Sequence, residues 1–325
     1  MRRCLVLLLV MSMLVVPSSA LAQLNLQLAH VYEPEHPFHK GSELAAQIVA
    51  ERTNGRIVIN IYPASQLGTE EEITEAVIHG SIPIVVSGAG QIGNLYRPIY
   101  VAEMPYIFRD IDHVMAFNES EIGKQLVEGL RQELGVRAIG ASTFGIRHIT
   151  SNKPIRTPDD LKDFRLRVPE QHVCIEYAKA LGAEPTPIAY AEAYMALQQG
   201  VVDGLENPLS AIYAMRFYEV QKYINLTRHV TNACYFLMND DVFLGLSEED
   251  QQIILDAFAE ASYLVADLMK QQDQDLIDYF KAQGVTIIEP DVDVFVAKAG
   301  DMAEGFKHWW APFGEDLHIR IRELK

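Results

Sequence analysis

The sequence of 325 residues is poor in positive charge, with 27 Lys and Arg against 44 Asp and Glu and a formal net charge of −17. An acidic chain repels nucleic-acid backbones and anionic lipid surfaces, so nucleic acid is not expected as a partner. Intrinsic disorder is excluded because 49% of the residues are hydrophobic and only 22% are charged. The chain therefore has enough apolar material for one large domain or two medium ones.

Cysteine is scarce as well, with only Cys4, Cys174 and Cys234. Three cysteines without a CxxC pair exclude a disulfide framework and a zinc site of the usual spacing. Cys174 and Cys234 could form one bridge in an oxidising compartment, but their apolar neighbours favour two buried free thiols. No metal and no cofactor is expected.

Long apolar stretches are absent after residue 22, and the stretch before it is too short to span a bilayer. Met1-Arg2-Arg3 precedes an apolar run over residues 4–16 and the small-residue site Ala20-Leu21-Ala22. This order is typical of a signal peptide, residues 1–22, that is cleaved before Gln23. Cys4 lies at the wrong end of the run for a lipid-modified cysteine, so we expect a soluble protein in the periplasm.

Apolar runs of strand length alternate with helical patterns, which indicates parallel βαβ units. No Pro/Gly/Ser-rich linker separates the two sets of elements, so strands are expected to cross between two lobes. The first set is strand 24–29, helix 37–52, strand 57–62, helix 70–79 and strand 82–87, and the second, from residue 146, is a helix start at 157–160, strand 165–168, helices 170–181 and 190–199 and strand 201–206.

The segment from Glu248 to Gln283 contains neither Gly nor Pro. Ser247 precedes it as a helix cap, with Asp250 at the third helical position, and Gly284 ends it. A helix of this length reaches roughly 50 Å, whereas about 30 Å matches the diameter of a small domain. One helix is therefore expected to brace both lobes.

Signatures of common enzymes are missing, since HExxH, GxSxG and the P-loop pattern do not occur. Residues 88–93 fit the GxGxxG pattern of dinucleotide-binding proteins, but that site needs the glycine turn to open a helix. Residues 94–98, Asn-Leu-Tyr-Arg-Pro, leave helical structure within one turn, so the prediction is a loop. Its glycines would allow the backbone to approach a ligand or the other lobe.

Three histidines lie close together near the N-terminus, at His30, His36 and His39, with Glu33 between them. Histidine and carboxylate are ligands of divalent transition metals, but no fourth ligand is evident. The favoured interpretation is a helix entry with polar residues at the edge of a cleft.

Two arginines interrupt apolar strands, Arg147 in residues 144–149 and Arg167 in residues 165–169. A buried guanidinium needs an anion, which is either an internal Asp or Glu or the carboxylate or phosphate of a ligand. Arg165 alternates to the opposite face and is expected at the surface. Asn207 ends a strand before a proline-started helix, where it either caps that helix or binds a ligand.

Ordered blocks along the chain carry a family pattern: residues 53–56, 62–63, 66–68, 104–108, 154–155, 158–162, 165–169, 181–187, 196–204, 206–208 and 217–223. Together they resemble the periplasmic solute-binding subunit of TRAP (tripartite ATP-independent periplasmic) transporters, the DctP-type family. The resemblance implies an α/β fold with two lobes, each a sheet with helices on both faces. Lobe I would comprise residues 23–145 plus about 230–262, and lobe II residues 146–229 plus about 263–325.

The same resemblance implies that Arg167 binds the ligand carboxylate, that Arg147 is a second contact and that Asn207 bonds the carboxylate or a nearby hydroxyl. Carboxylates in the cleft would repel a second acid group and accept hydrogen bonds from hydroxyls. A sugar acid such as a hexuronate or aldonate is therefore expected, with a C4 dicarboxylate as the alternative. The remaining cleft candidates, chosen by residue type, are His30, Glu33, Ser87, Gln91, Glu170, Tyr190 and Tyr213.

The family resemblance also implies a monomer that delivers its small anionic solute to membrane permease subunits. Two rivals remain. One is an exported sugar-acid lyase on the same scaffold, with His30 and Glu33 as its acid/base pair, and the other is a module that delivers its ligand to a sensor. Trp309 and Trp310 mark either an interface or packing onto the second lobe.

Overall fold

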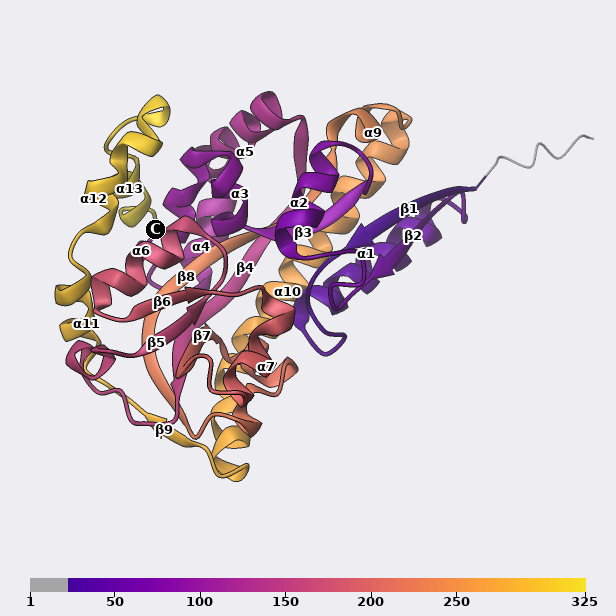
Figure 1. Ribbon diagram of the computed structural model, residues 1–325. Coiled ribbons are helices and arrows are strands. Elements are labelled where there is room, and N and C mark those ends of the chain that lie inside the picture. Colours follow the sequence, from indigo (N-terminus) through magenta and orange to yellow (C-terminus); the bar gives the residue numbers. More distant parts are fainter. Residues whose placement is uncertain (1–22) are drawn as a thin grey trace, which may run out of the picture.

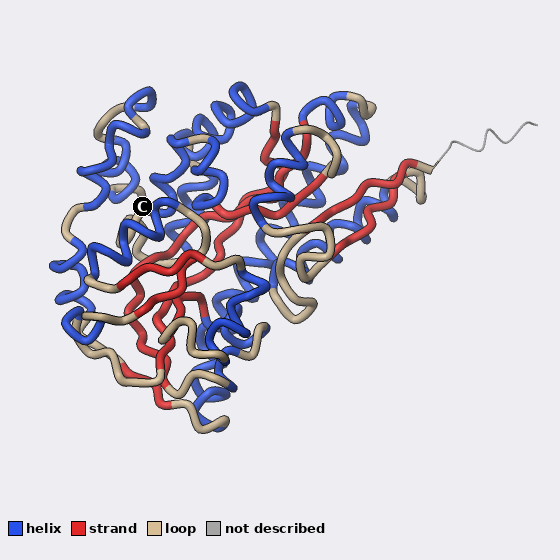
Figure 2. Tube along the Cα trace, in the orientation of Figure 1, coloured by secondary structure: helices blue, strands red, loops and turns tan. Residues whose placement is uncertain are grey.

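The computed structural model describes residues 23–325, and the predicted signal peptide lies outside the described residues (Figure 1). A nine-stranded sheet runs through the molecule, and helices flank it along its length (Figure 2). Within residues 23–325, no helix combines the length and apolarity needed to cross a membrane.

The first half of the molecule follows the predicted alternation closely. Its elements are β1 (Leu24–Ala29), α1 (Pro37–Arg52), β2 (Ile57–Tyr62), α2 (Glu70–Ile78), β3 (Ile84–Gly88), α3 (Ala89–Leu95), the 3-10 helix η1 (Arg97–Glu103), α4 (Ile111–Glu119) and α5 (Glu121–Leu134). β1 pairs in parallel with β2 and β3. A capping box starts α2, because Thr69 Oγ1 accepts from the Glu72 N–H and the Glu72 carboxylate accepts from the Thr69 N–H.

The second half has shorter elements. They are the 3-10 helix η2 (Pro158–Leu161), β5 (Arg165–Val168), α6 (His172–Leu181), β6 (Glu184–Pro187), α7 (Ala193–Gln198), β7 (Gly204–Pro208), α8 (Leu209–Ala214) and β9 (Thr286–Ile288). β5 pairs in parallel with β6 and β7. The predicted helix start at residues 157–160 is a single 3-10 turn, and the predicted strand 201–206 begins later, at Gly204.

Two long strands, β4 (Val136–Ser151) and β8 (Tyr223–Asn239), join the halves. They are antiparallel to each other, so the sheet is mixed, and the predicted parallel units lie on either side of this antiparallel centre. The start of β4 pairs with the part of β8 that also pairs with β3, whereas its end pairs with β7. A register shift between Thr143 and Gly145 lies between these regions, and such irregularities bend a strand.

The strand order is β2-β1-β3-β8-β4-β7-β5-β6, with β9 beside β8. The two halves are thus hydrogen-bonded into one continuous sheet rather than two separate ones. As predicted, the chain crosses between the halves on strands, which are β4 and β8.

The predicted brace is α10 (Glu248–Ala282), a helix of 35 residues that follows the short α9 (Asp240–Leu244). Ser247 caps it by accepting a hydrogen bond from the Asp250 N–H at 3.2 Å. The helix packs on α1 in the first half and on α8 and β9 in the second, which confirms the expectation that one helix contacts both (Figure 1).

The C-terminal segment contacts both halves of the molecule. It consists of α11 (Val292–Ala299), α12 (Met302–Phe306) and α13 (Leu317–Arg322), with 3-10 turns between the last two. α11 packs on α6, but the end of the chain returns to the first half, where the Arg109 guanidinium donates to the carbonyls of Arg322 and Leu324 at 3.0 and 2.7 Å.

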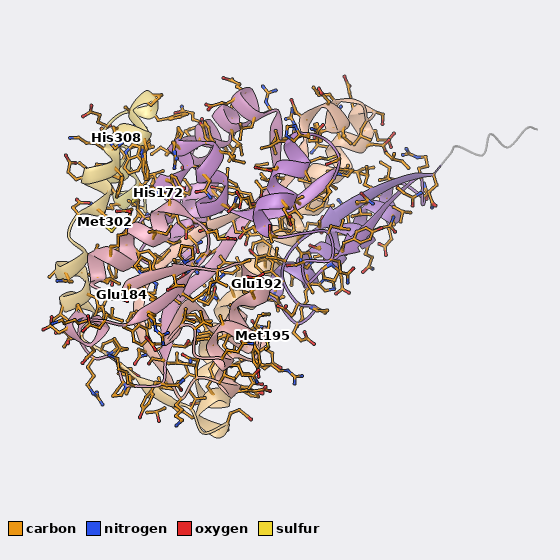
Figure 3. The ribbon with its side chains drawn as sticks, viewed as in Figure 1. His172, Glu184, Glu192, Met195, Met302 and His308 are labelled. Carbon is orange, nitrogen blue, oxygen red and sulfur yellow. The ribbon has the colours of Figure 1, made fainter. Side chains whose placement is uncertain are left out.

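The two tryptophans follow this return. The Trp309 ring packs against Tyr100 of η1 at 4.9 Å between centroids and against His172 of α6 at 5.5 Å, while Trp310 is fully buried. Figure 3 shows His172 beside the segment that carries Met302 and His308. Trp309 therefore lies between the halves instead of packing on the second one alone.

Candidate ligand-binding site

A polar cavity lies between the two halves, where the carboxyl ends of β3, β5 and β7 approach one another. The centre of a water molecule can occupy a volume of about 50 Å³ in this cavity, so only a small solute fits. The lining residues are Val31, Tyr32, Thr69, Glu70, Glu71, Gly88, Gln91 and Glu103 from the first half, and Phe144, Arg147, Arg167, Pro169, Glu170, Gln171, Ala189, Tyr190, Asn207 and Asn232 from the rest.

The halves touch across this cavity. Asn94 Nδ2 donates to the Glu170 carbonyl at 2.9 Å, and Asn94 Oδ1 accepts from the His172 N–H at 3.3 Å. The Tyr190 hydroxyl donates to Glu33 Oε2 at 3.4 Å. The two halves are therefore in direct contact beside the cavity, and both contribute to its walls.

Arg147 has an internal partner. On β4 it faces Glu206 of β7, and its Nε and Nη2 donate to the two carboxylate oxygens as a bidentate pair. Both side chains are buried. Burial acts to lower the pKa of Arg147, but the charge of Glu206 outweighs it, so the pKa is raised. Burial likewise opposes ionisation of Glu206, yet Arg147 and a hydrogen bond from His229 hold its pKa at about 2.

Arg167 on β5 has no carboxylate partner among residues 23–325. Its Nε and Nη2 both donate to the Ile188 carbonyl, at 2.9 and 2.6 Å, and only 1% of the residue is exposed. Burial lowers its pKa, opposed by the charge of Glu206. Its neighbour Arg165 points the other way and pairs with Asp203, as strand alternation predicts.

Four further predicted residues reach the cavity. Asn207 does not cap α8; its Nδ2 is buried and has no hydrogen-bond partner in the described part of the chain. Gln91 on α3, Glu170 after β5 and Tyr190 complete the set. Burial of the Tyr190 hydroxyl, together with the charge of Glu33, raises its pKa, so it remains a neutral donor.

The other four predicted residues do not line the cavity. Ser87 bonds Thr74 behind the wall at 2.9 Å, and Tyr213 packs edge-on against Tyr279. Glu33 reaches only the Tyr190 hydroxyl, and burial raises its pKa to about 7. Side chains alternate between the two faces along a strand, but this alternation does not specify which residue points inward where the chain turns into the following loop.

His30 is also outside the cavity. Its Nδ1 accepts from the Tyr32 N–H at 3.2 Å, its Nε2 bonds His39 Nδ1 at 3.1 Å, and burial lowers its pKa to about 3. The acid/base pair that a lyase would need, His30 with Glu33, is therefore not assembled at the cavity. No group of three His, Cys, Asp or Glu within residues 23–325 is placed to hold a metal. Cys174 and Cys234 are both free and buried.

The glycine-rich segment 88–93 is not the predicted loop, because it forms α3. The helix ends at Leu95, so residues 94–98 do leave helical structure, but only after the glycines have formed almost two turns of α3. The expected close approach does occur at Gly90, where an added Cβ would lie 2.7 Å from Gln171 Cδ and 3.2 Å from Glu103 Cδ. The absent side chain lets α3 contact the second half.

Sequence reasoning missed Glu70, Glu103 and Asn232. Glu70 opens α2, directly after the β2 strand and its turn, which is a position where open α/β sheets bind ligands. Glu103 is a lone carboxyl in the apolar run 98–104, and a buried carboxyl in such a run was the available signal. No feature of the sequence indicated Asn232, because its position opposite η1 depends on the long-range course of β8.

Comparison with known proteins agrees with this architecture. The family model described as "Bacterial extracellular solute-binding protein, family 7" (DctP) matches residues 28–302. The chain belongs to this family. Its relatives are solute-binding proteins of TRAP transporters, so the family comprises binding proteins and not enzymes, and its curated members are described as periplasmic.

Three relatives illustrate the range of this family. The sialic acid-binding periplasmic protein SiaP of Vibrio cholerae is 32% identical over 79% of this chain and 80% of its own length. The C4-dicarboxylate-binding periplasmic protein DctP of Rhodobacter capsulatus is 29% identical over 80% of this chain and 78% of its own. A TRAP solute-binding protein of Roseobacter denitrificans, solved with bound L-galactonate, superimposes with a TM-score of 0.86 at 30% identity, covering 91% of this chain and 98% of its own.

Proposed function

We propose that this protein captures a sugar acid, a hexuronate or an aldonate, in the periplasm and delivers it to the permease subunits of a TRAP transporter. One observation carries the proposal: Arg167 is buried in the cavity wall and has no carboxylate partner within residues 23–325. A buried guanidinium in that state is costly until an anion joins it. Asn207 lines the same cavity, and its Nδ2, which has no hydrogen-bond partner in the described part of the chain, supplies a donor for the same carboxylate.

In the proposed binding mode, each arginine offers the cavity the nitrogen that its protein partners leave free. For Arg167 and Arg147 alike, Nε and Nη2 are occupied, which leaves Nη1 for the ligand. Asn207, Tyr190 and Gln91 add neutral hydrogen bonds. The bound galactonate of the Roseobacter relative supports a sugar acid, and the Rhodobacter relative is the support for the alternative, a C4 dicarboxylate.

Capture would proceed by closure of the halves. Bending of β4 and β8 opens the cavity, the carboxylate docks on Arg167, and the contacts of Asn94 with Glu170 and His172 form as the halves meet. Ligand favours the closed form because residues from both halves touch it only there.

The protein is proposed to act as an exported monomer, after cleavage of residues 1–22, with no nucleic-acid partner and no catalytic activity of its own. A sensor in place of the permease would leave the site unchanged and differ only in the partner.

A thermal-shift screen of the purified mature protein tests the function. Hexuronates, aldonates, C4 dicarboxylates and 2-oxo acids would be compared, since a ligand raises the midpoint according to its binding free energy. A rise with a uronate or aldonate, lost in Arg167→Ala, is expected. A rise with C4 dicarboxylates alone would select the alternative, and turnover of a sugar acid would establish the lyase.

A further inference from the structure

We propose that Glu103 and Asn232 form a hydroxyl-reading subsite in the cavity, and that Glu70 excludes ligands with a second carboxylate. This inference rests on the proposed function and deepens it, because it limits the ligand to polyhydroxylated monocarboxylates.

The charges of the cavity wall support one ligand carboxylate. Its described lining holds two cations, Arg147 and Arg167, and four carboxyl groups, Glu70, Glu71, Glu103 and Glu170. Arg147 is already neutralised by Glu206, which leaves Arg167 as the cation without a carboxylate partner. A second ligand carboxylate would lose its hydration in the cavity without gaining a cation.

Glu103 is placed to bond hydroxyls. It ends η1, only 2% of it is exposed, and its Oε2 accepts from Asn232 Nδ2 at 2.7 Å. Burial raises the pKa of Glu103 to about 8, opposed by the charge of Arg147, so the group is mostly protonated at neutral pH. A protonated carboxyl both donates and accepts, which matches a hydroxyl.

Asn232 gives the second, independent observation. It lines the cavity and is 3% exposed, and its Oδ1 has no hydrogen-bond partner within residues 23–325. A buried acceptor without a donor raises the free energy of the folded protein. The hydrogen bond from Asn232 Nδ2 to Glu103 does not explain why Oδ1 lacks a donor. A ligand hydroxyl supplies the missing donor, whereas a ligand carboxylate, which only accepts, does not.

Glu70 adds to the selection. Its Oε1 accepts from the Gly88 N–H at 2.9 Å, and its carboxyl lines the cavity. Burial raises its pKa, and Arg147 and Arg167 act in the opposite direction. In either protonation state it accepts from a hydroxyl, and in its charged state it repels a carboxylate.

Matched ligands test the proposal by isothermal titration calorimetry. Galactonate and galactarate differ only in that a terminal CH₂OH becomes a carboxylate, and gluconate with glucarate makes an equivalent pair. For the parent protein we expect about 100-fold weaker binding of the diacid in whichever pair binds best. Equal affinities for both members would overturn the inference while the proposed function stands.

The variants locate the selection. Glu70→Gln keeps the shape of the wall, removes the carboxylate that would repel a second acid group, and is expected to narrow the diacid discrimination by about tenfold or more. Asn232→Leu is expected to weaken the monoacid by about tenfold. Glu75→Gln removes one carboxylate from an exposed position of α2 and serves as the control, with discrimination as in the parent.

Unchanged discrimination in Glu70→Gln, with a thermal midpoint near that of the parent, would contradict the inference. The outcome that defeats the proposed function is different: none of the uronates or aldonates would bind the parent protein, and Arg167→Ala would change nothing.

Discussion

Arg147 and Arg167 carry the same side chain on strands of the same sheet, yet their surroundings differ. Arg147 is 4% exposed and bonded in bidentate fashion to Glu206, whereas Arg167 is 1% exposed and, among the described residues, bonded to the Ile188 carbonyl alone. The pKa of Arg147 is raised and that of Arg167 is lowered. The difference teaches that a buried arginine contributes to the fold when its counter-ion is internal and to ligand binding when it is not.

The largest expected effect comes from removing the internally paired arginine. Arg147→Met leaves the Glu206 carboxylate buried without its cation and should lower the free energy of unfolding by about 3–5 kcal/mol. Urea denaturation measures this change. The double variant Arg147→Met, Glu206→Gln should recover most of the loss, and a double variant as unstable as the single one would show that the pair is not what stabilises this region.

Removing the other arginine should give the opposite pattern. Arg167→Met is expected to weaken sugar-acid binding by about 2–5 kcal/mol, because a buried charge-assisted contact is lost. The ligand-free protein should be as stable as the parent or more stable, since an uncompensated charge has gone. Calorimetric titration and urea denaturation of the same sample separate the two effects; loss of stability as large as that of Arg147→Met would refute the distinction.

Acid should convert Arg147 into a second unpaired arginine. The folded pKa of Glu206, about 2, lies below the ordinary value of 4.5 for a glutamate, so its contribution to stability is complete above about pH 4.5 and is lost as the pH falls towards 2. The loss should reach about 3 kcal/mol. Urea denaturation between pH 5 and 3 should show a steeper decline in the parent than in Arg147→Met, Glu206→Gln, and parallel declines would argue against it.

A smaller effect is expected where the two halves meet around these arginines. In Gly90→Ala the new Cβ would collide with Gln171 and press on Glu103. The clash should impede closure of the halves and so weaken ligand binding by about 1–3 kcal/mol. Gly305→Ala on α12 is the matched control, because nothing lies within 4 Å of its added Cβ. Equal affinities of the two variants would mean that the halves tolerate a wider separation.

Local sequence signals predicted much of this comparison, and long-range pairing decided the rest. The apolar strand context placed both arginines in the interior, and the cap at Ser247 with the absence of Gly and Pro defined α10. The partner of Arg147 depends on the antiparallel register that sets Ile149 opposite Glu206, and no local pattern encodes a contact between residues so far apart in the chain. The return of the C-terminus to Arg109 is hidden for the same reason.

The three crossings between the halves also have a mechanical meaning. Two bodies joined by one flexible chain can swing and twist in every direction, but here β4, β8 and α10 run across together, and the C-terminal segment holds α6 through α11 and Arg109 through its last carbonyls. Parallel connections of this kind resist torsion and sliding far more than bending. We therefore expect one dominant hinge motion, in which each opening returns the same faces to register around the cavity.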